Sequence, residues 1–133
     1  MPNAAQAGAV IFAKDLHRVA TFYEKLLGLT ATHSDSDHLV LASAQCELVI
    51  HAIPKAIADS FEITVPPERR TETAIKLYFP IASLAEARAR APALGGELNA
   101  PEHEWEARGF RACDGHDPEG NVLQLRERSP AAG

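Results

Sequence analysis

The sequence predicts an α+β fold in which two tandem βαβββ modules form a curved mixed sheet, a half-barrel cup with the helices outside. Each half begins with a short apolar strand and an amphipathic helix that has a capping residue before it and a glycine after it. The second cap, Ser83, follows the first, Asp15, by 68 residues, and Gly96 follows Gly28 by the same interval. A constant offset between equivalent positions indicates an internal repeat. One module alone would leave an apolar face uncovered, whereas two can share an interior.

Composition and charge narrow the class of protein. Of the 133 residues, 46% are apolar and 23% charged, as expected for one folded domain with a sizeable core. The formal net charge of −5 argues against nucleic acid or an anionic membrane surface as the main partner. No apolar run is long enough to span a bilayer. Cys46 and Cys113 are too few for a zinc site or a disulfide framework, so we expect reduced thiols and a cytoplasmic protein.

The first module is predicted over residues 8–53, after a short tail at 1–7. Asp15 caps a helix over Leu16–Leu27, in which apolar residues recur at helical spacing, and Gly28 ends it. Apolar runs around this helix predict strands at 8–13, 29–33, 38–42 and 47–51.

A linker is predicted over residues 54–73, because this stretch contains two adjacent prolines and a run of charged residues. Within it, residues 61–65 are expected to form a short edge strand. The linker separates the two copies of the repeat.

The second module is predicted over residues 74–127, before a tail at 128–133. Ser83 and Glu86 have the spacing of a capping box at the start of a helix, and Pro92 is expected to bend or shorten its last turn before Gly95 and Gly96 end it. The expected strands are 74–79, which Lys76 interrupts, then 98–99, 110–114 and 122–126.

A tight turn is predicted at residues 117–121, with the sequence DPEGN. Proline presets the backbone at the second turn position, Gly120 can adopt a positive φ, and Asp117 and Asn121 can hydrogen-bond the local backbone. By itself, this pattern indicates only a hairpin at the end of a domain.

In combination with two other stretches, the turn resembles a known superfamily. Residues 10–16 (VIFAKDL), 22–29 (FYEKLLGL) and 117–121 (DPEGN) occur at the ends of a duplicated domain where vicinal oxygen chelate proteins have them. This superfamily includes glyoxalase I, bleomycin-resistance proteins, fosfomycin-resistance proteins and extradiol dioxygenases. The resemblance covers residues 8–127, nearly the whole chain, and implies one such domain. Its members catalyse different reactions, so the resemblance leaves the activity open.

The resemblance also implies where a metal would bind. Metal-using members have ligands on the first and last strands of each half, which correspond here to Gly8, His51, Lys76 and Gln124. Divalent cations prefer several imidazoles or carboxylates, and only His51 is a good ligand in this set. We therefore expect neither a metal nor another cofactor at these positions.

Strand alternation indicates which side chains share a face. His51 lies on the face of Val49 and Glu47, where it could be a structural residue or line the cup. Lys76 could be an exposed edge charge; if it faces inward it needs an anionic partner. Asp114 should lie opposite Gln124 across the last hairpin and could supply that partner.

Four other polar and aromatic side chains also have expected placements. Cys113 lies on the opposite face of its strand from Asp114 and is expected to be a buried thiol. Trp105 is expected in a loop or at a strand end, where it could line a pocket, contact a partner or pack on a helix. His103 and His116 are expected to be solvated loop residues.

The first functional hypothesis is a metal-independent small-molecule protein of the glyoxalase/bleomycin-resistance type. Its cup would bind an organic ligand that is anionic or carries a carbonyl group. If it is an enzyme, His51 is the candidate acid or base and Lys76 the electrostatic stabiliser. The candidate ligand-binding residues, polar or apolar side chains of the cup, are Val10, Phe12, Tyr78, Asp114 and Gln124.

Two alternatives stay open. One is a metal-dependent lyase, isomerase or dioxygenase with displaced ligands, drawn from His33, His38, His51, His116, Glu47 and Asp114. The other is a scaffold that only dimerises, with its cup filled by side chains. A homodimer is expected in any case, because half-open sheets leave strand edges and apolar faces to cover.

Overall fold

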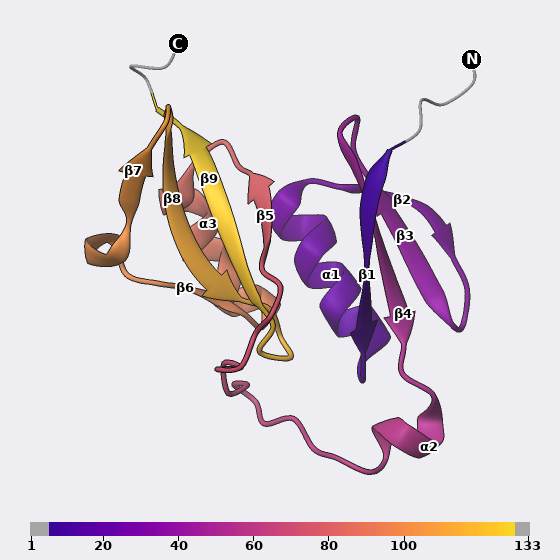
Figure 1. Cartoon of the computed structure of the whole chain (residues 1–133). Helices are drawn as coiled ribbons and strands as arrows, with labels where there is room; N and C mark the ends of the chain where they lie inside the picture. Colours follow the sequence, from indigo (N-terminus) through magenta and orange to yellow (C-terminus); the bar gives the residue numbers. More distant parts are fainter. Residues whose placement is uncertain (1–5, 130–133) are drawn as a thin grey trace, which may run out of the picture. The chain divides into compact units, whose positions relative to one another are not determined.

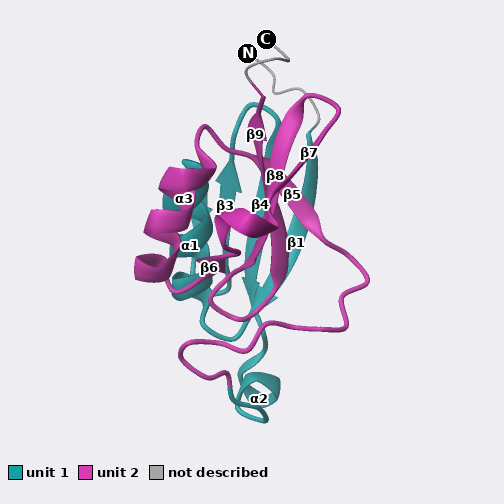
Figure 2. Ribbon diagram, turned by 90° about the vertical axis from the view of Figure 1, so that its left-hand side faces the viewer, with its two compact units in different colours: residues 1–62 teal, residues 63–133 magenta. Residues whose placement is uncertain are grey.

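In the computed structural model, which describes residues 6–129, the first half of the chain has the order βαβββ, and the second half has the same order with one further short strand, β7 (Trp105–Ala107). The chain divides into two compact units, residues 1–62 and 63–133 (Figures 1 and 2). Each unit has one mixed sheet and one main helix, so the α+β class and the repeated βαβββ order are confirmed. Within the described residues, no helix is both long and apolar enough to cross a membrane. Of the expected tails at 1–7 and 128–133, residues 1–5 and 130–133 lie outside the described part, whereas Ala7 and Arg128 belong to strands at the two ends of the described chain.

The first unit has a four-stranded sheet in the order β1-β4-β3-β2. Strand β1 runs parallel to β4, and the other neighbours are antiparallel. The strands and helices of this unit are β1 (Ala7–Ala13), α1 (Leu16–Leu27), β2 (Thr30–Ser34), β3 (His38–Ala42), β4 (Cys46–Ala52) and the short α2 (Lys55–Ala58).

Helix α1 begins and ends where its caps predict. The Asp15 side chain accepts a hydrogen bond from the Arg18 N–H at 3.1 Å, and Gly28 ends the helix with φ of 68°. One stripe of the helix is buried against the sheet, together with Leu41, Leu48 and Ile50. The opposite sheet face, which includes Val10 and Phe12, stays open; these two side chains are 55% and 58% exposed.

The second unit has the strand order β5-β9-β8-β6, and β7 also pairs with β8. Here too the first strand is parallel to the last, β5 to β9, and the others are antiparallel. Its elements are β5 (Leu77–Pro80), α3 (Leu84–Arg90), the 3₁₀ turns η1 (Ala91–Leu94) and η2 (Pro101–His103), β6 (Glu97–Leu98), β7 (Trp105–Ala107), β8 (Phe110–His116) and β9 (Val122–Arg128).

Helix α3 is shorter than α1, and Pro92 is the reason. Proline cannot continue the α-helical hydrogen bonds, so the chain tightens into η1. Gly95, with φ of 93°, then ends it in the left-handed conformation. We predicted Gly96 as the counterpart of Gly28, and this is wrong by one residue because of the tightened turn.

Two predictions about the linker and β5 are also wrong. Residues 61–65 form no strand; they precede Pro66 and Pro67, which cannot donate ladder hydrogen bonds, and Phe61 instead lies under the Lys14 ammonium. Strand β5 starts at Leu77 rather than residue 74, because its only partner, β9, begins just after a turn. Lys76 therefore immediately precedes β5 instead of interrupting it.

The predicted turn at 117–121 is confirmed in detail. Asp117 is fully buried, and its Oδ1 accepts hydrogen bonds from the backbone N–H groups of Glu119 at 2.9 Å and Asn121 at 3.0 Å. Gly120 has φ of 83°, and a Cβ atom there would lie 2.1 Å from the carbonyl oxygen of Glu68. The turn is thus packed beneath the segment that precedes β5.

Candidate functional site

A row of polar side chains crosses one face of the second sheet. Gln124 on β9 lies between Tyr78 on β5 and Asp114 on β8, since it is the register partner of both. Lys76, just before β5, places its Nζ 2.8 Å from Asp114 Oδ2. The expected ion pair and the expected Asp114–Gln124 alignment are therefore both present.

Hydrogen bonds make this row continuous. Gln124 Nε2 donates to Asp114 Oδ1 at 3.2 Å, and Arg126 Nε donates to Gln124 Oε1 at 2.7 Å. We call Lys76, Asp114, Gln124 and Arg126 the polar row. Gln124 is buried, whereas the Lys76 side chain is 38% exposed. The row has two cations and one carboxylate, a net charge of +1.

Arg126 is the member of the row that sequence reasoning missed. Its Cζ lies 3.5 Å from the centre of the Tyr78 ring and 4.2 Å from that of Phe110, and no carboxylate within residues 6–129 pairs with it. A shallow hollow of about 370 Å³, lined by Phe110, Arg126 and Arg128 among others, lies beside it. Strand alternation could have indicated Arg126, because it follows Gln124 by two residues.

The first unit places His51 on the open face of its sheet. His51 is the register partner of Phe12 on β1 and His38 on β3, with ring centres 5.5 Å and 5.7 Å away. Its Nδ1 is 2.9 Å from the Ala52 carbonyl oxygen, which fixes the ring. A hollow of about 790 Å³ lies beside it, also lined by Lys14 and Asp37 among others. The structure thus groups His51 with Phe12, and Val10 is on the same face.

Comparisons with known proteins identify the family. A family profile described as a glyoxalase-like domain matches residues 8–126, most of the chain. The chain belongs to the glyoxalase-like domain family. This places it in the vicinal oxygen chelate superfamily, as the sequence motifs indicated. Among curated protein sequences, none matches the chain significantly.

Solved structures show the same fold at low sequence identity. A glyoxalase/bleomycin resistance protein/dioxygenase family enzyme from Burkholderia phytofirmans is 18% identical, covers 93% of this chain and 99% of its own, and has a TM-score of 0.65. A glyoxalase/bleomycin resistance protein from Albidiferax ferrireducens is also 18% identical, with coverages of 92% and 97% and a TM-score of 0.63. A variant of the fosfomycin resistance protein FosX from Listeria monocytogenes, complexed with Mn(II) and 1S,2S-dihydroxypropylphosphonic acid, is 17% identical, with coverages of 99% and 97% and a TM-score of 0.61.

The positions at which the superfamily holds its metal do not suit a divalent cation in this glyoxalase-like domain. Gly8 has no ligand atom, and a Cβ added there would lie 2.5 Å from the backbone oxygen of Glu47. Lys76 is a cation, and Gln124 uses both ends of its amide within the polar row. His51 is the one suitable donor at these positions. A separate group that could hold a metal, His33, Asp35 and His38, lies on the β2–β3 hairpin.

His116 is not the solvated loop residue that we predicted. It is the last residue of β8 and is only 6% exposed, because β8 continues beyond residue 114. Arg69 Nε donates to His116 Nδ1 at 2.9 Å, and Arg69 Nη1 donates to Asn99 Oδ1 at 2.6 Å. Burial, and then the charge of Arg69, lower the pKa of His116. His103 is exposed, as expected.

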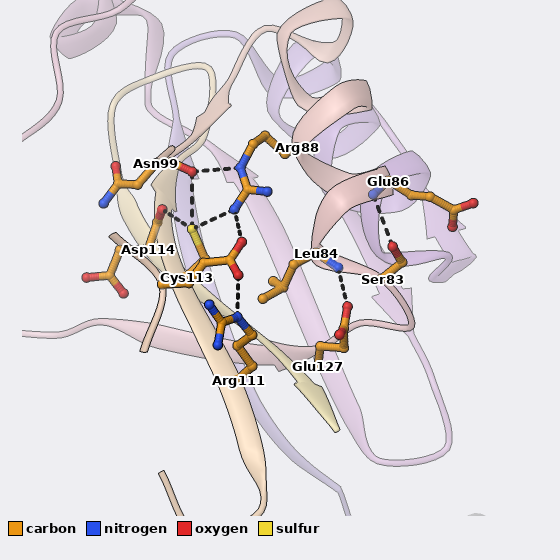
Figure 3. A network of polar contacts seen from close by, with 10 residues as sticks. Ser83, Leu84, Glu86, Arg88, Asn99, Arg111, Cys113, Asp114 and Glu127 are labelled. Carbon is orange, nitrogen blue, oxygen red and sulfur yellow. Dashed lines mark hydrogen bonds and ion pairs between the residues drawn. The ribbon is translucent and has the colours of Figure 1, made fainter. Parts of the chain in front are cut away.

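Behind the polar row, the opposite face of β8 contacts α3 through an ion network (Figure 3). Glu104 pairs with Arg88 and, at 2.5 Å, with the Nε of Arg111. Burial acts to raise the pKa of Glu104, but the hydrogen bonds from Arg111 and Arg88 outweigh it and hold this pKa below its usual value. Cys113 is fully buried, as expected, and its thiol donates to the Asn99 carbonyl oxygen at 3.3 Å.

Trp105, the first residue of β7, is 40% exposed and pairs with Ala112 of β8. It thus lies at a strand end, one of the two placements expected for it. Its indole is neither buried in the core nor part of the polar row.

Proposed function

We propose that this glyoxalase-like domain binds a small organic ligand that is anionic or carries a carbonyl group, without the metal that its superfamily uses. The polar row and Tyr78 would supply the contacts in the second unit. His51, Val10 and Phe12 form a separate candidate binding surface on the first unit. The observation that carries the proposal is the polar row itself.

The charge of the polar row supports an anionic ligand. Asp114 neutralises Lys76 at 2.8 Å, so Arg126 is the cation of the row that lacks a carboxylate partner within the described residues. A charged hydrogen bond to a ligand oxygen contributes about 1.5–3 kcal/mol. The phosphonate bound in the FosX variant is an anion held in the same fold, by a protein that also has Mn(II).

A catalytic form of this function would have His51 as its candidate acid or base on the first unit, or Lys76 as its candidate electrostatic stabiliser on the second. A histidine near neutral pH can donate or accept a proton, and a lysine can stabilise negative charge that develops on a substrate oxygen. The Nδ1 contact with the Ala52 carbonyl leaves His51 Nε2 as the nitrogen for this role.

The test is a titration of the tag-free, ¹⁵N-labelled protein with benzoate, phenylglyoxylate and phenylphosphonate, and with benzamide as an uncharged comparison. At least one acid should shift the amide signals around Gln124, and benzamide should shift them less. Lys76→Met keeps the side-chain bulk, removes the positive charge and leaves Asp114 to repel the acid. It should therefore weaken the acid by about 1.5–3 kcal/mol, roughly 10- to 150-fold.

The matched control is Lys55→Met. Lys55 also forms a lysine–aspartate pair, with Asp59 at 2.6 Å, but its side chain is 88% exposed and belongs to the first unit. This variant should bind the acid as the wild type does. Equal binding of acid and benzamide, or equal loss in both lysine variants, would contradict the proposal.

A further inference from the structure

Two histidines and an aspartate converge at the tip of the β2–β3 hairpin. His33 is near the end of β2, Asp35 is in the turn, and His38 is the first residue of β3. His33 Nε2 lies 2.8 Å from Asp35 Oδ2, and His38 Nδ1 lies 3.3 Å from Asp35 Oδ1. One ligand atom from each of the three residues lies within 4.8 Å of the other two.

Hydrogen bonds within the hairpin hold the Asp35 carboxylate in place before any ion binds. Asp35 Oδ1 accepts hydrogen bonds from the backbone N–H groups of Asp37 at 2.8 Å and His38 at 3.0 Å. The Asp35 N–H in turn donates to the His38 carbonyl oxygen at 3.0 Å. The carboxylate is therefore fixed by the turn, and its Oδ2 is directed to His33.

Ring stacking orients the two imidazoles. The ring centres of His33 and His38 are 4.8 Å apart with 30° between their planes, and His38 also stacks on His51 at 5.7 Å and 10°. His51 belongs to β4, so the hairpin group is anchored to a strand inside the sheet. Less side-chain entropy is lost on binding an ion when the ligands are already oriented.

The donor set determines which ion would suit the site. Imidazole nitrogens favour Zn²⁺, Ni²⁺, Co²⁺ and Cu²⁺, whereas Mg²⁺ and Ca²⁺ prefer oxygen ligands. Zn²⁺ holds nitrogen and oxygen ligands at about 2.0–2.2 Å, so tetrahedral ligands lie about 3.5 Å apart. One ligand atom from each of the three residues lies within 4.8 Å of the others, so small side-chain rotations would bring them to that separation.

We propose that the β2–β3 hairpin is a binding site for a divalent transition-metal ion, with His33, Asp35 and His38 as ligands. Three protein ligands leave at least one coordination position for water or for another ligand. None of its three ligands is among Gly8, His51, Lys76 and Gln124, the positions to which the sequence resemblance assigns the superfamily's metal, although His38 stacks on His51. The site does not depend on the ligand proposed for the polar row.

The test is Zn²⁺ binding to the tag-free full chain, measured by competition with a chromophoric chelator at pH 7.5. The expected dissociation constant is on the order of 10 µM or tighter. His33→Ala and His38→Ala should each weaken Zn²⁺ by at least about tenfold. The three side chains lie at the surface, so these variants should fold, which circular dichroism will verify.

Two controls separate this site from other histidines and from the polar row. His17→Ala removes an exposed histidine of α1 in the same unit, and Lys76→Met changes the polar row; both should keep the wild-type Zn²⁺ affinity. In NMR spectra, Zn²⁺ should shift the imidazole signals of His33 and His38 and not that of His17.

The Zn²⁺ affinities of the wild type and the variants decide whether the hairpin is a metal site. Loss of affinity confined to the hairpin variants supports the proposal. A wild-type dissociation constant above about 100 µM, or an equal loss in the His17 variant, overturns it and leaves the three residues as a hydrogen-bonded turn.

Discussion

The ion network behind the polar row should contribute measurably to stability, and Glu104→Gln tests it. Glu104 is 9% exposed and is shared by Arg88, which is 20% exposed, and Arg111, which is 40% exposed. Replacing it with glutamine keeps the shape of the side chain and leaves two guanidinium groups without their carboxylate. Removing one partner of a fully buried ion pair costs about 3–5 kcal/mol.

The cost in free energy should be smaller here, because both arginines are partly exposed to water. Arg111 can regain water, and Arg88 keeps its 2.8 Å hydrogen bond to the Asn99 carbonyl oxygen. We therefore expect Glu104→Gln to lower the free energy of unfolding by about 2–3 kcal/mol at pH 7. Urea denaturation followed by circular dichroism and by Trp105 fluorescence measures this change.

The control is Glu106→Gln. Glu106 is 65% exposed and lies 3.7 Å from Arg111 Nη1, so its loss should cost less than about 0.5 kcal/mol. A change below about 1 kcal/mol in Glu104→Gln, or one equal to the control, would refute the reasoning.

The pH dependence gives a second check on the same residue. The pKa of Glu104 is lower in the folded state, so its stabilising contribution is complete above the usual glutamate pKa and is lost as the pH falls through the folded value. The difference in unfolding free energy between wild type and Glu104→Gln should therefore shrink below about pH 4. A constant difference between pH 7 and pH 3 would show that the carboxylate charge is not its source.

Three other features lead to measurable expectations. Gly120→Ala should lower the unfolding free energy by about 2–4 kcal/mol in urea titrations, because φ is 83° and a Cβ would meet the Glu68 carbonyl; a change under about 0.5 kcal/mol would contradict this. Burial and Arg69 lower the pKa of His116, so the folded state favours the neutral imidazole. The unfolding free energy of the wild type should therefore fall as the pH drops below 6.5, and this part of the fall should be absent in His116→Gln. Light scattering at tens of micromolar should show a homodimer, because the face around Phe12 is open; a monomer would contradict it.

Local chemistry made much of the fold predictable. The caps at Asp15 and Ser83 fixed the helix starts because a side-chain oxygen satisfies an N–H group at once, independent of tertiary structure. The turn at 117–121 aligned Asp114 with Gln124, because register follows from the turn. The approach of Lys76 to Asp114 was expected only if Lys76 faced inward; its side chain is 38% exposed, and the contact follows from the alignment of Asp114 with the start of β5 through Gln124.

The predictions that were wrong or missing concern residues whose surroundings come from distant parts of the sequence. His116 is buried because Arg69, 47 residues earlier, covers it, and no local pattern reveals that contact. Arg126 was not among the predicted site residues, although strand alternation places it on the same face as Gln124. The rings beside it come from β5 and β8, which only the sheet order brings together.

The position of Arg126 between aromatic rings restricts the direction from which an anion can reach it. Strand β9 lies between β5 and β8, so the Tyr78 and Phe110 rings, one from each neighbouring strand, lie 3.5 Å and 4.2 Å from the Arg126 Cζ and occupy part of the space around the guanidinium. Its Nε is engaged by Gln124, which leaves the two terminal nitrogens along one rim. A planar group with two oxygens, lying in the guanidinium plane, can accept a separate hydrogen bond from each nitrogen, whereas a spherical ion such as chloride has one centre that both must share. Arg126 should therefore discriminate among anions by shape as well as by charge.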